Sequence, residues 1–104
     1  MEIHVEQKQD KSIIVLDKNK ILGTEAVEIQ NTLLELIQGG KKKIAVDLSK
    51  VDYITSWGIG ILIHAHTSCL NRNIEFTLEG VNKDVFKIFK KVKLDTIFNI
   101  QTGV

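Results

Sequence analysis

The sequence predicts one α/β domain in which a mixed, mostly parallel sheet of four to five strands packs against three to four helices. Short apolar or alternating segments, typical of strands, take turns with longer segments in which apolar residues recur every three or four positions. The resulting order is β-β-α-β-α-β-α-(β), which favours parallel strands joined by right-handed crossovers. The length of 104 residues corresponds to a single domain over residues 1–104.

Two strands are expected at the start of the chain. Ile3 and Val5 alternate with polar residues, which is the pattern of a half-buried strand. Residues 9–11 are polar and indicate a turn, and residues 12–16 form a continuous apolar run. Because the link between them is so short, we expect an antiparallel pair. Residues 17–23 are then expected to form a loop.

The first helix follows this loop. Thr24 is a good N-cap, and Glu25 in the first turn is favoured by the helix dipole. Apolar residues then recur on one face until Gly39 and Gly40 end the helix. The three lysines at 41–43 are interpreted as a solvated turn before the next strand, in preference to a binding patch.

The third strand and a loop come next. Residues 44–48 are a short apolar strand, and residues 49–55 form a loop. We expect Val51, Tyr53 and Ile54 to turn inward from that loop.

The second helix is the most apolar segment of the chain. Residues 56–71 are apolar on nearly every side, so the helix is expected to be buried against a sheet or covered by a partner. A further strand follows at 74–78, and Asn82 is the expected cap of a third helix over 83–91. Residues 94–100 are expected to pack as a short strand or turn.

Composition excludes several classes of function. The formal net charge is +1, from 14 basic and 13 acidic residues, which argues against nucleic acid as a partner. Cys69 is the only cysteine, so we expect no disulfide and a cytoplasmic location. The N-terminal residues have no signal-peptide pattern, and no apolar stretch is long enough for membrane insertion.

The segment with the clearest chemistry is a serine at the mouth of the buried helix. Ser56 is predicted to be the N-cap, and Gly58 and Gly60 remove bulk from the first turn. The free N–H groups of such a turn form an anion site. A phosphate on Ser56 would therefore be tolerated by the fold, with a gain of about 0.3–1 kcal/mol from the helix dipole.

The same phosphate has the opposite effect on a partner. It adds about −1.5 to −2 charges at neutral pH. Burying that charge at an uncharged interface without a matching Arg or Lys costs several kcal/mol. Because about 1.4 kcal/mol changes an affinity tenfold, such a group turns a tight complex off without a conformational change.

The residues around this serine resemble the signature of the STAS family of anti-sigma factor antagonists. A strand ends in Asp47-Leu48-Ser49, and an apolar spacer leads to Thr55-Ser56-Trp57-Gly58-Ile59-Gly60, which is similar to the family's D-S-x-G-x-G. Residues 73–78 resemble the strand after the helix, and residues 85–100 resemble the family's ending. The resemblance covers roughly the whole chain.

The resemblance implies a non-enzymatic switch without a cofactor or metal. In the family, the serine that matches Ser56 is phosphorylated by an anti-sigma factor that is a serine kinase. The unphosphorylated form sequesters that kinase and releases a sigma factor, and a PP2C-type phosphatase restores it. The residues implied to lie at the docking surface are Thr55, Trp57, Gly58, Ile59 and Gly60, together with Ile21, Leu22 and Gly23 before the first helix.

Two positions depart from the family pattern. Thr55 stands where the family commonly has aspartate, which makes Thr55 the second candidate for phosphorylation. Trp57 stands where the family has a small residue. Its indole is either a hot spot for the partner or a side chain folded onto the sheet edge, and the sequence leaves both interpretations open.

Other chemistries are weaker interpretations. Ser56 with His64 or His66 and with Asp47 suggests a hydrolytic triad, but His64 lies two helical turns from Ser56 and the sequence has no G-x-S-x-G motif. His66 and Cys69 share a helix face, yet two ligands do not make a zinc site. Gly58-x-Gly60 is too short for a dinucleotide fingerprint.

Two further interpretations concern surfaces. Four lysines of the third helix, at 83, 87, 90 and 91, are interpreted as a solvated face in preference to a membrane-binding one. The main rival lies within the STAS family itself, where such domains also serve as accessory subunits of membrane transport systems or of signalling assemblies, without a phosphorylation cycle.

Overall fold

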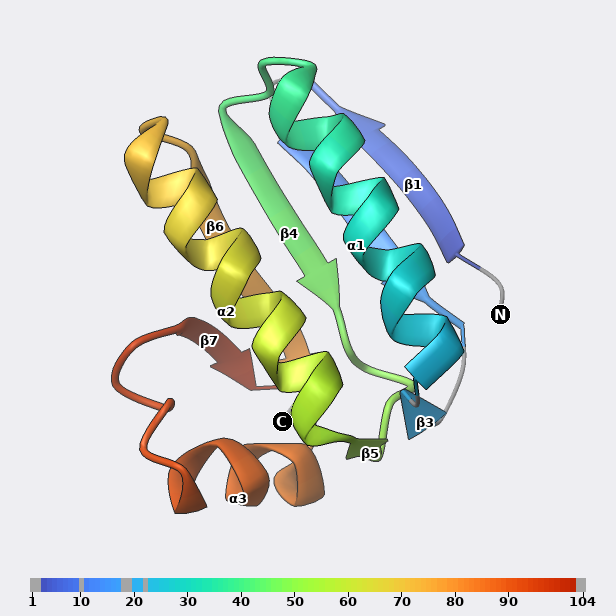
Figure 1. The fold of residues 1–104 in the computed structure, drawn as a ribbon, viewed down its shortest axis with the longest axis vertical. Coiled ribbons are helices and arrows are strands. Elements are labelled where there is room, and N and C mark those ends of the chain that lie inside the picture. Colours follow the sequence, from blue (N-terminus) through green and yellow to red (C-terminus); the bar gives the residue numbers. More distant parts are fainter. Residues whose placement is uncertain (1–2, 10, 18–19, 22, 103–104) are drawn as a thin grey trace.

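The computed structural model describes residues 3–9, 11–17, 20–21 and 23–102 (Figure 1). One five-stranded sheet has the strand order β1-β2-β4-β6-β7. β1 (Ile3–Lys8) is antiparallel to β2 (Lys11–Leu16), whereas β2, β4 (Lys43–Asp47), β6 (Glu75–Val81) and β7 (Asn99–Thr102) are mutually parallel. The predicted mixed, mostly parallel sheet is therefore confirmed.

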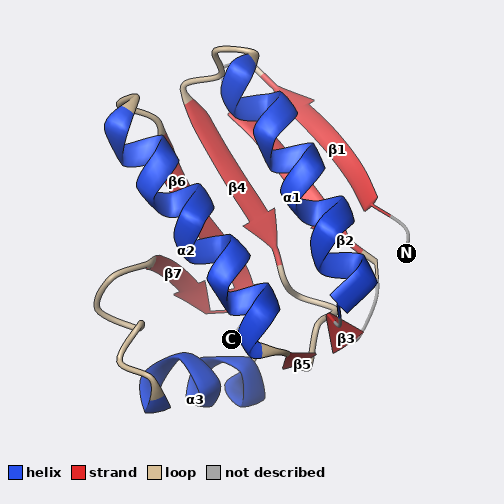
Figure 2. Cartoon of the chain, in the orientation of Figure 1, coloured by secondary structure: helices blue, strands red, loops and turns tan. Residues whose placement is uncertain are grey.

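Two helices cover one face of this sheet (Figure 2). α1 (Gly23–Gln38) and α2 (Ser56–Asn71) lie side by side, and α3 (Lys83–Lys91) lies across the end of the sheet beside β5 (Tyr53–Ile54). Because α1 leads into β4 and α2 leads into β6, both helices point the same way and both N-termini lie at one end of the domain. No described helix is both long and apolar enough to cross a membrane.

The core lies between the sheet and the two helices. Ile14, Val46 and Leu78 sit in register on adjacent strands, and each is fully buried. α1 contributes Leu33 and α2 contributes Leu62 to the same cluster. Burying a side chain of this kind contributes roughly 1.5–3 kcal/mol, so this row positions both helices firmly on the sheet.

The loop prediction for residues 17–23 was wrong in one respect. Lys20–Ile21 form a short strand, β3, which pairs in parallel with β5 in the register Lys20↔Tyr53 and Ile21↔Ile54. The pairing was not visible in the sequence because two residues are too few for a periodic pattern. It links the segment before α1 to the segment before α2.

Some side chains differ from expectation. Tyr53 is 48% exposed, whereas it was predicted to turn inward with Val51 and Ile54, which are buried. Successive residues of a strand point to opposite faces, so β5 buries Ile54 and exposes Tyr53. Val5 is 40% exposed because β1 is the edge strand.

The ends of two elements also differ. α1 begins at Gly23, so Thr24 lies in the first turn and is not the residue before it. The last strand is β7, and the predicted segment 94–100 divides into a turn at 95–97 and the first residues of that strand.

Candidate functional site

The segment between β4 and α2 positions Ser56, and it is anchored at its start by the Asp-Leu-Ser motif. The Asp47 carboxylate accepts a hydrogen bond from the Ser49 amide at 2.8 Å, which is an Asx turn. The Leu48 amide donates to the Glu79 carbonyl at 2.8 Å, and the Val51 amide donates to the Leu48 carbonyl at 2.9 Å. The motif therefore fixes the direction in which the chain leaves the sheet.

Gly80 allows β6 to approach this turn closely. Its φ is +67°, and a Cβ at this position would lie 2.8 Å from the Ser49 Cβ. Both the left-handed backbone and the close approach require glycine. Gly80 was not singled out in the sequence, although a glycine near the end of a strand is a known sign of such an approach.

Asn82 ties the third helix to the same segment. Its side-chain oxygen accepts from the Val85 amide at 3.0 Å, which caps α3 as predicted. Its side-chain nitrogen donates to the Val51 carbonyl. One side chain thus holds α3 beside the segment that leads to Ser56, a second role that sequence patterns do not reveal.

The predicted contact segment before α1 lies at this end of the domain. Ile21 pairs with Ile54, two residues before Ser56, and Gly23 begins α1. Leu22 lies outside the described residues. The backbone of Ile21 is therefore a neighbour of the Ser56 segment.

Thr55, and not Ser56, is the N-cap of α2, which corrects the sequence prediction. Thr55 has an extended backbone (φ −77°, ψ 165°), and its hydroxyl accepts from the Gly58 amide at 3.3 Å. Ser56 already belongs to the helix, so its hydroxyl is not used for capping. Aspartate and threonine are both good N-caps, so Thr55 preserves the structural role of the family's usual residue.

Ser56 is an exposed hydroxyl at the positive end of a helix of 16 residues. The amides of the first turn point out of the helix end, and the first turn contains no acidic residue. An anion on Ser56 would therefore be favoured by the helix dipole and would meet no negative charge in that turn. Within the described part of the chain, no basic side chain donates a hydrogen bond to the Ser56 hydroxyl.

Several exposed residues that are close to Ser56 in β5 and α2 carry no charge, whereas the exposed residue before β5, Asp52, is acidic. We define the Ser56 surface as Tyr53, Ser56, Trp57 and Gly60, all of which are exposed. Trp57 is 58% exposed, so its indole is not folded away against the sheet. A Cβ added at Gly60 would meet no atom of the described residues within 4 Å.

Two other residues predicted at the docking surface face inward. Gly58 and Ile59 are buried in the domain, and Ile59 belongs to the hydrophobic core. The spacing of α2 explains this, because residues two and three positions after Ser56 lie on the side that packs against the sheet. They hold the helix in place, while Trp57 and Gly60 face solvent.

The structure does not bring Ser56, His64 and Asp47 together as a hydrolytic triad. The Asp47 carboxylate is bonded to the Ser49 amide. His64 is exposed on α2, about 12 Å along the axis from Ser56 at 1.5 Å per residue.

The described residues support neither metal binding nor thiol chemistry. Within the described part of the chain, no three His, Cys, Asp or Glu side chains gather as metal ligands. Cys69 is fully buried, and this burial raises the pKa of its thiol to about 11, against a smaller lowering by Arg72. Such a thiol stays protonated and unreactive at neutral pH.

Comparison with known proteins connects this geometry to a family. Residues 2–104 match the profile described as the STAS domain. The anti-sigma-B factor antagonist of Listeria monocytogenes is 31% identical over 58 residues, which cover 56% of this chain and 51% of that protein. The chain therefore spans about half the length of the curated relatives it matches.

Solved structures share the fold at low sequence identity. An anti-sigma factor antagonist from Mycobacterium paratuberculosis has a TM-score of 0.85 at 18% identity, covering 96% of this chain and 84% of that one. A sulfate transporter family protein from Wolinella succinogenes has a TM-score of 0.75 at 12% identity, covering 93% and 80%. From the profile match over nearly its whole length, the chain belongs to the STAS domain family.

Proposed function

We propose that this protein is an anti-sigma factor antagonist whose Ser56 surface binds an anti-sigma factor, and that phosphorylation of Ser56 abolishes the binding. The unphosphorylated form would release a sigma factor or another downstream regulator. The observation that carries the proposal is the exposed, unengaged hydroxyl of Ser56 at the start of α2, beside an exposed indole. The similarity to an anti-sigma-B factor antagonist supports the same class of partner.

The geometry supports Ser56 over Thr55 as the acceptor. The Thr55 hydroxyl caps α2 through the Gly58 amide, so a phosphate on that oxygen would disturb the cap. The Ser56 hydroxyl makes no such bond, and a phosphate there extends from the helix end into solvent. Phosphorylation of Ser56 is therefore compatible with an unchanged fold.

A phosphate on Ser56 would affect docking of the partner more than it affects folding. The helix dipole stabilises a phosphate by about 0.3–1 kcal/mol. Burying a dianion against an uncharged partner surface costs several kcal/mol, and 3 kcal/mol corresponds to a loss of affinity of roughly 150-fold. The proposed switch thus acts by charge at the interface and needs no refolding.

The proposal includes two partners and a compartment. The anti-sigma factor would itself be the serine kinase, and a PP2C-type phosphatase would regenerate the binding form. The proteins would meet in the cytoplasm. Trp57 and Tyr53 would supply aromatic contacts, which are enriched among the residues that dominate binding energy.

The alternative is an accessory STAS subunit of a membrane transport system or a signalling assembly, without a phosphorylation cycle. The fold does not separate the two, because a sulfate transporter family protein shares it. The modification of Ser56 does separate them. A gene for a serine kinase or a PP2C-type phosphatase beside this one would favour the switch, and a permease gene would favour the alternative.

Mapping of the phosphorylation site by mass spectrometry, after incubation with the candidate kinase and ATP, tests the proposal. We expect one phosphate on Ser56 in the wild-type protein and none in Ser56→Ala. Thr55→Asn is the matched control, because asparagine keeps the cap and removes the second hydroxyl. The Thr55→Asn protein should be phosphorylated on Ser56 as the wild type is. If the wild-type protein carried a phosphate on neither Ser56 nor Thr55, the switch would be refuted.

A further inference from the structure

A hollow of about 250 Å³ lies at the end of the domain opposite Ser56. It is framed by the turn from α1 to β4 and the turn from α2 to β6, which are joined by a hydrogen bond from the Glu75 amide to the Lys42 carbonyl at 2.9 Å. At 1.5 Å per residue, α2 separates this hollow from Ser56 by about 24 Å. The hollow is therefore independent of the proposed switch site.

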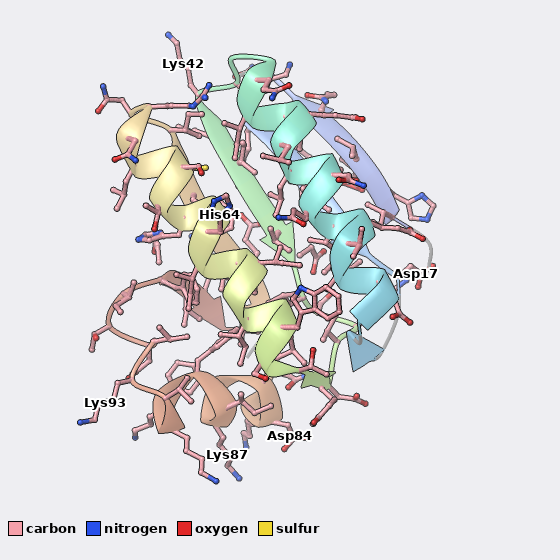
Figure 3. The ribbon with its side chains drawn as sticks, viewed as in Figure 1. Asp17, Lys42, His64, Asp84, Lys87 and Lys93 are labelled. Atoms are coloured by element: carbon pink, nitrogen blue, oxygen red, sulfur yellow. The ribbon has the colours of Figure 1, made fainter. Side chains whose placement is uncertain are left out.

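Three cationic side chains line the hollow, and no acidic side chain does. Lys41 is half-buried, while Lys42 and Arg72 are exposed. None of the three forms an ion pair with a carboxylate of the described residues. Figure 3 shows Lys42 at this end of the molecule, far from Lys87 and Lys93 at the other.

The local backbone explains why the cations converge. Gly40 has a φ of +77° and Asn73 a φ of +58°, so each helix ends in a left-handed residue. These two reversals turn the chain back to the sheet within a few residues. Lys41, Lys42 and Arg72 are thereby held on the rim of one hollow.

The negative partial charges of the two helix C-termini offset only part of this positive charge. Two helix C-termini carry about −0.5 elementary charge each, or about −1 together. Three cations against that leave an excess of about +2 among the residues that line the hollow, none of which is acidic. Unbalanced positive charge around a concave site favours a multiply charged anion.

From these observations we propose that the hollow binds a small anion bearing phosphate. The guanidinium of Arg72 can pair with two phosphoryl oxygens at once, and the two lysines can bind as point charges. Ile37 and Ile74 provide apolar wall for a short carbon skeleton. The volume is below the usual 300–1,000 Å³ of drug-sized sites, so a compact phosphorylated metabolite fits better than a nucleotide.

Backbone amide NMR titration in 150 mM salt tests this site, with inorganic pyrophosphate and glycerol 3-phosphate as separate probes. We expect saturable shifts confined to residues 38–42 and 71–75. Arg72→Ala should weaken binding by roughly 10- to 100-fold, as for the loss of a charged hydrogen bond. Lys87→Ala, which removes an exposed lysine on α3, is the matched control and should bind as the wild type does.

The pattern of shifts decides the outcome. Binding of pyrophosphate alone would assign the site to an inorganic phosphate, and binding of both probes would assign it to an organic one. Shifts that do not saturate, that spread over the α3 lysines or that persist unchanged in Arg72→Ala would overturn the proposal. Because Ser56 is untouched in every variant, this result is separate from that of the phosphorylation experiment.

Discussion

Gly60→Ala is expected to stabilise the protein while weakening its complex with the anti-sigma factor that we propose as its partner. Gly60 lies inside α2, it is exposed, and an added Cβ meets no described atom within 4 Å. Replacing glycine by alanine within a helix is worth about 0.8–1 kcal/mol. For a chain of 104 residues, the unfolding entropy converts this gain to a rise in Tm of about 4 °C.

The added methyl group has the opposite effect on a closely packed interface. Interface cores pack as densely as protein interiors, where an extra methylene costs about 1–3 kcal/mol. We therefore expect the affinity for the anti-sigma factor to fall by roughly 5- to 150-fold. Thermal unfolding followed by circular dichroism measures the change in Tm, and isothermal titration calorimetry with the anti-sigma factor measures the change in affinity.

Thr67→Ala is the matched control for this experiment. Thr67 is an exposed residue of the same helix, about 16 Å from Ser56 along the axis. Alanine there should also favour the helix, but it should leave the affinity unchanged. If Gly60→Ala raised the Tm and bound as tightly as the wild type, the docking surface would not include Gly60. If the Tm of Gly60→Ala fell, this would contradict the finding that a Cβ at this position meets no neighbouring atom.

Three further changes test the site and its supports. Thr55→Ala should lower the unfolding free energy by about 1 kcal/mol through loss of the cap, and Thr55→Asn should not, as measured by urea denaturation. Gly80→Ala should lower it by about 2–4 kcal/mol, since a left-handed backbone and a 2.8 Å approach to Ser49 both oppose a side chain; a loss under 1 kcal/mol would contradict the close approach. Cys69 should resist a thiol reagent in the folded state. Its thiol keeps its proton to about pH 11 in the fold and to about 9.0 when unfolded, so stability should fall by about 2–3 kcal/mol as pH rises from about 9 to about 11, with no further loss from this group above that, and Cys69→Ala should lack this component.

The order of elements was predictable because the core is strongly periodic. Leu33, Leu62 and Leu78 are buried where the helix and strand patterns place them, and Gly39 and Gly40 end α1 as expected. These predictions depend on local spacing and local turn chemistry, which the sequence carries directly.

Other features depend on contacts between distant residues. The two-residue pair β3–β5, the approach of Gly80 to Ser49 and the bond from Asn82 to Val51 all join separated segments. The cap of α2 was misassigned by one residue because Thr55 and Ser56 are both good caps, and only the backbone angles distinguish them. That one-residue difference leaves the Ser56 hydroxyl free.

The affinity of the proposed anti-sigma factor for this protein, measured with and without a phosphate on Ser56, is the decisive test of the phosphorylation switch. We predict that the phosphorylated protein keeps its Tm or gains slightly, and that its affinity falls at least about 100-fold. Equal affinities for the two forms, with both folded, would contradict it.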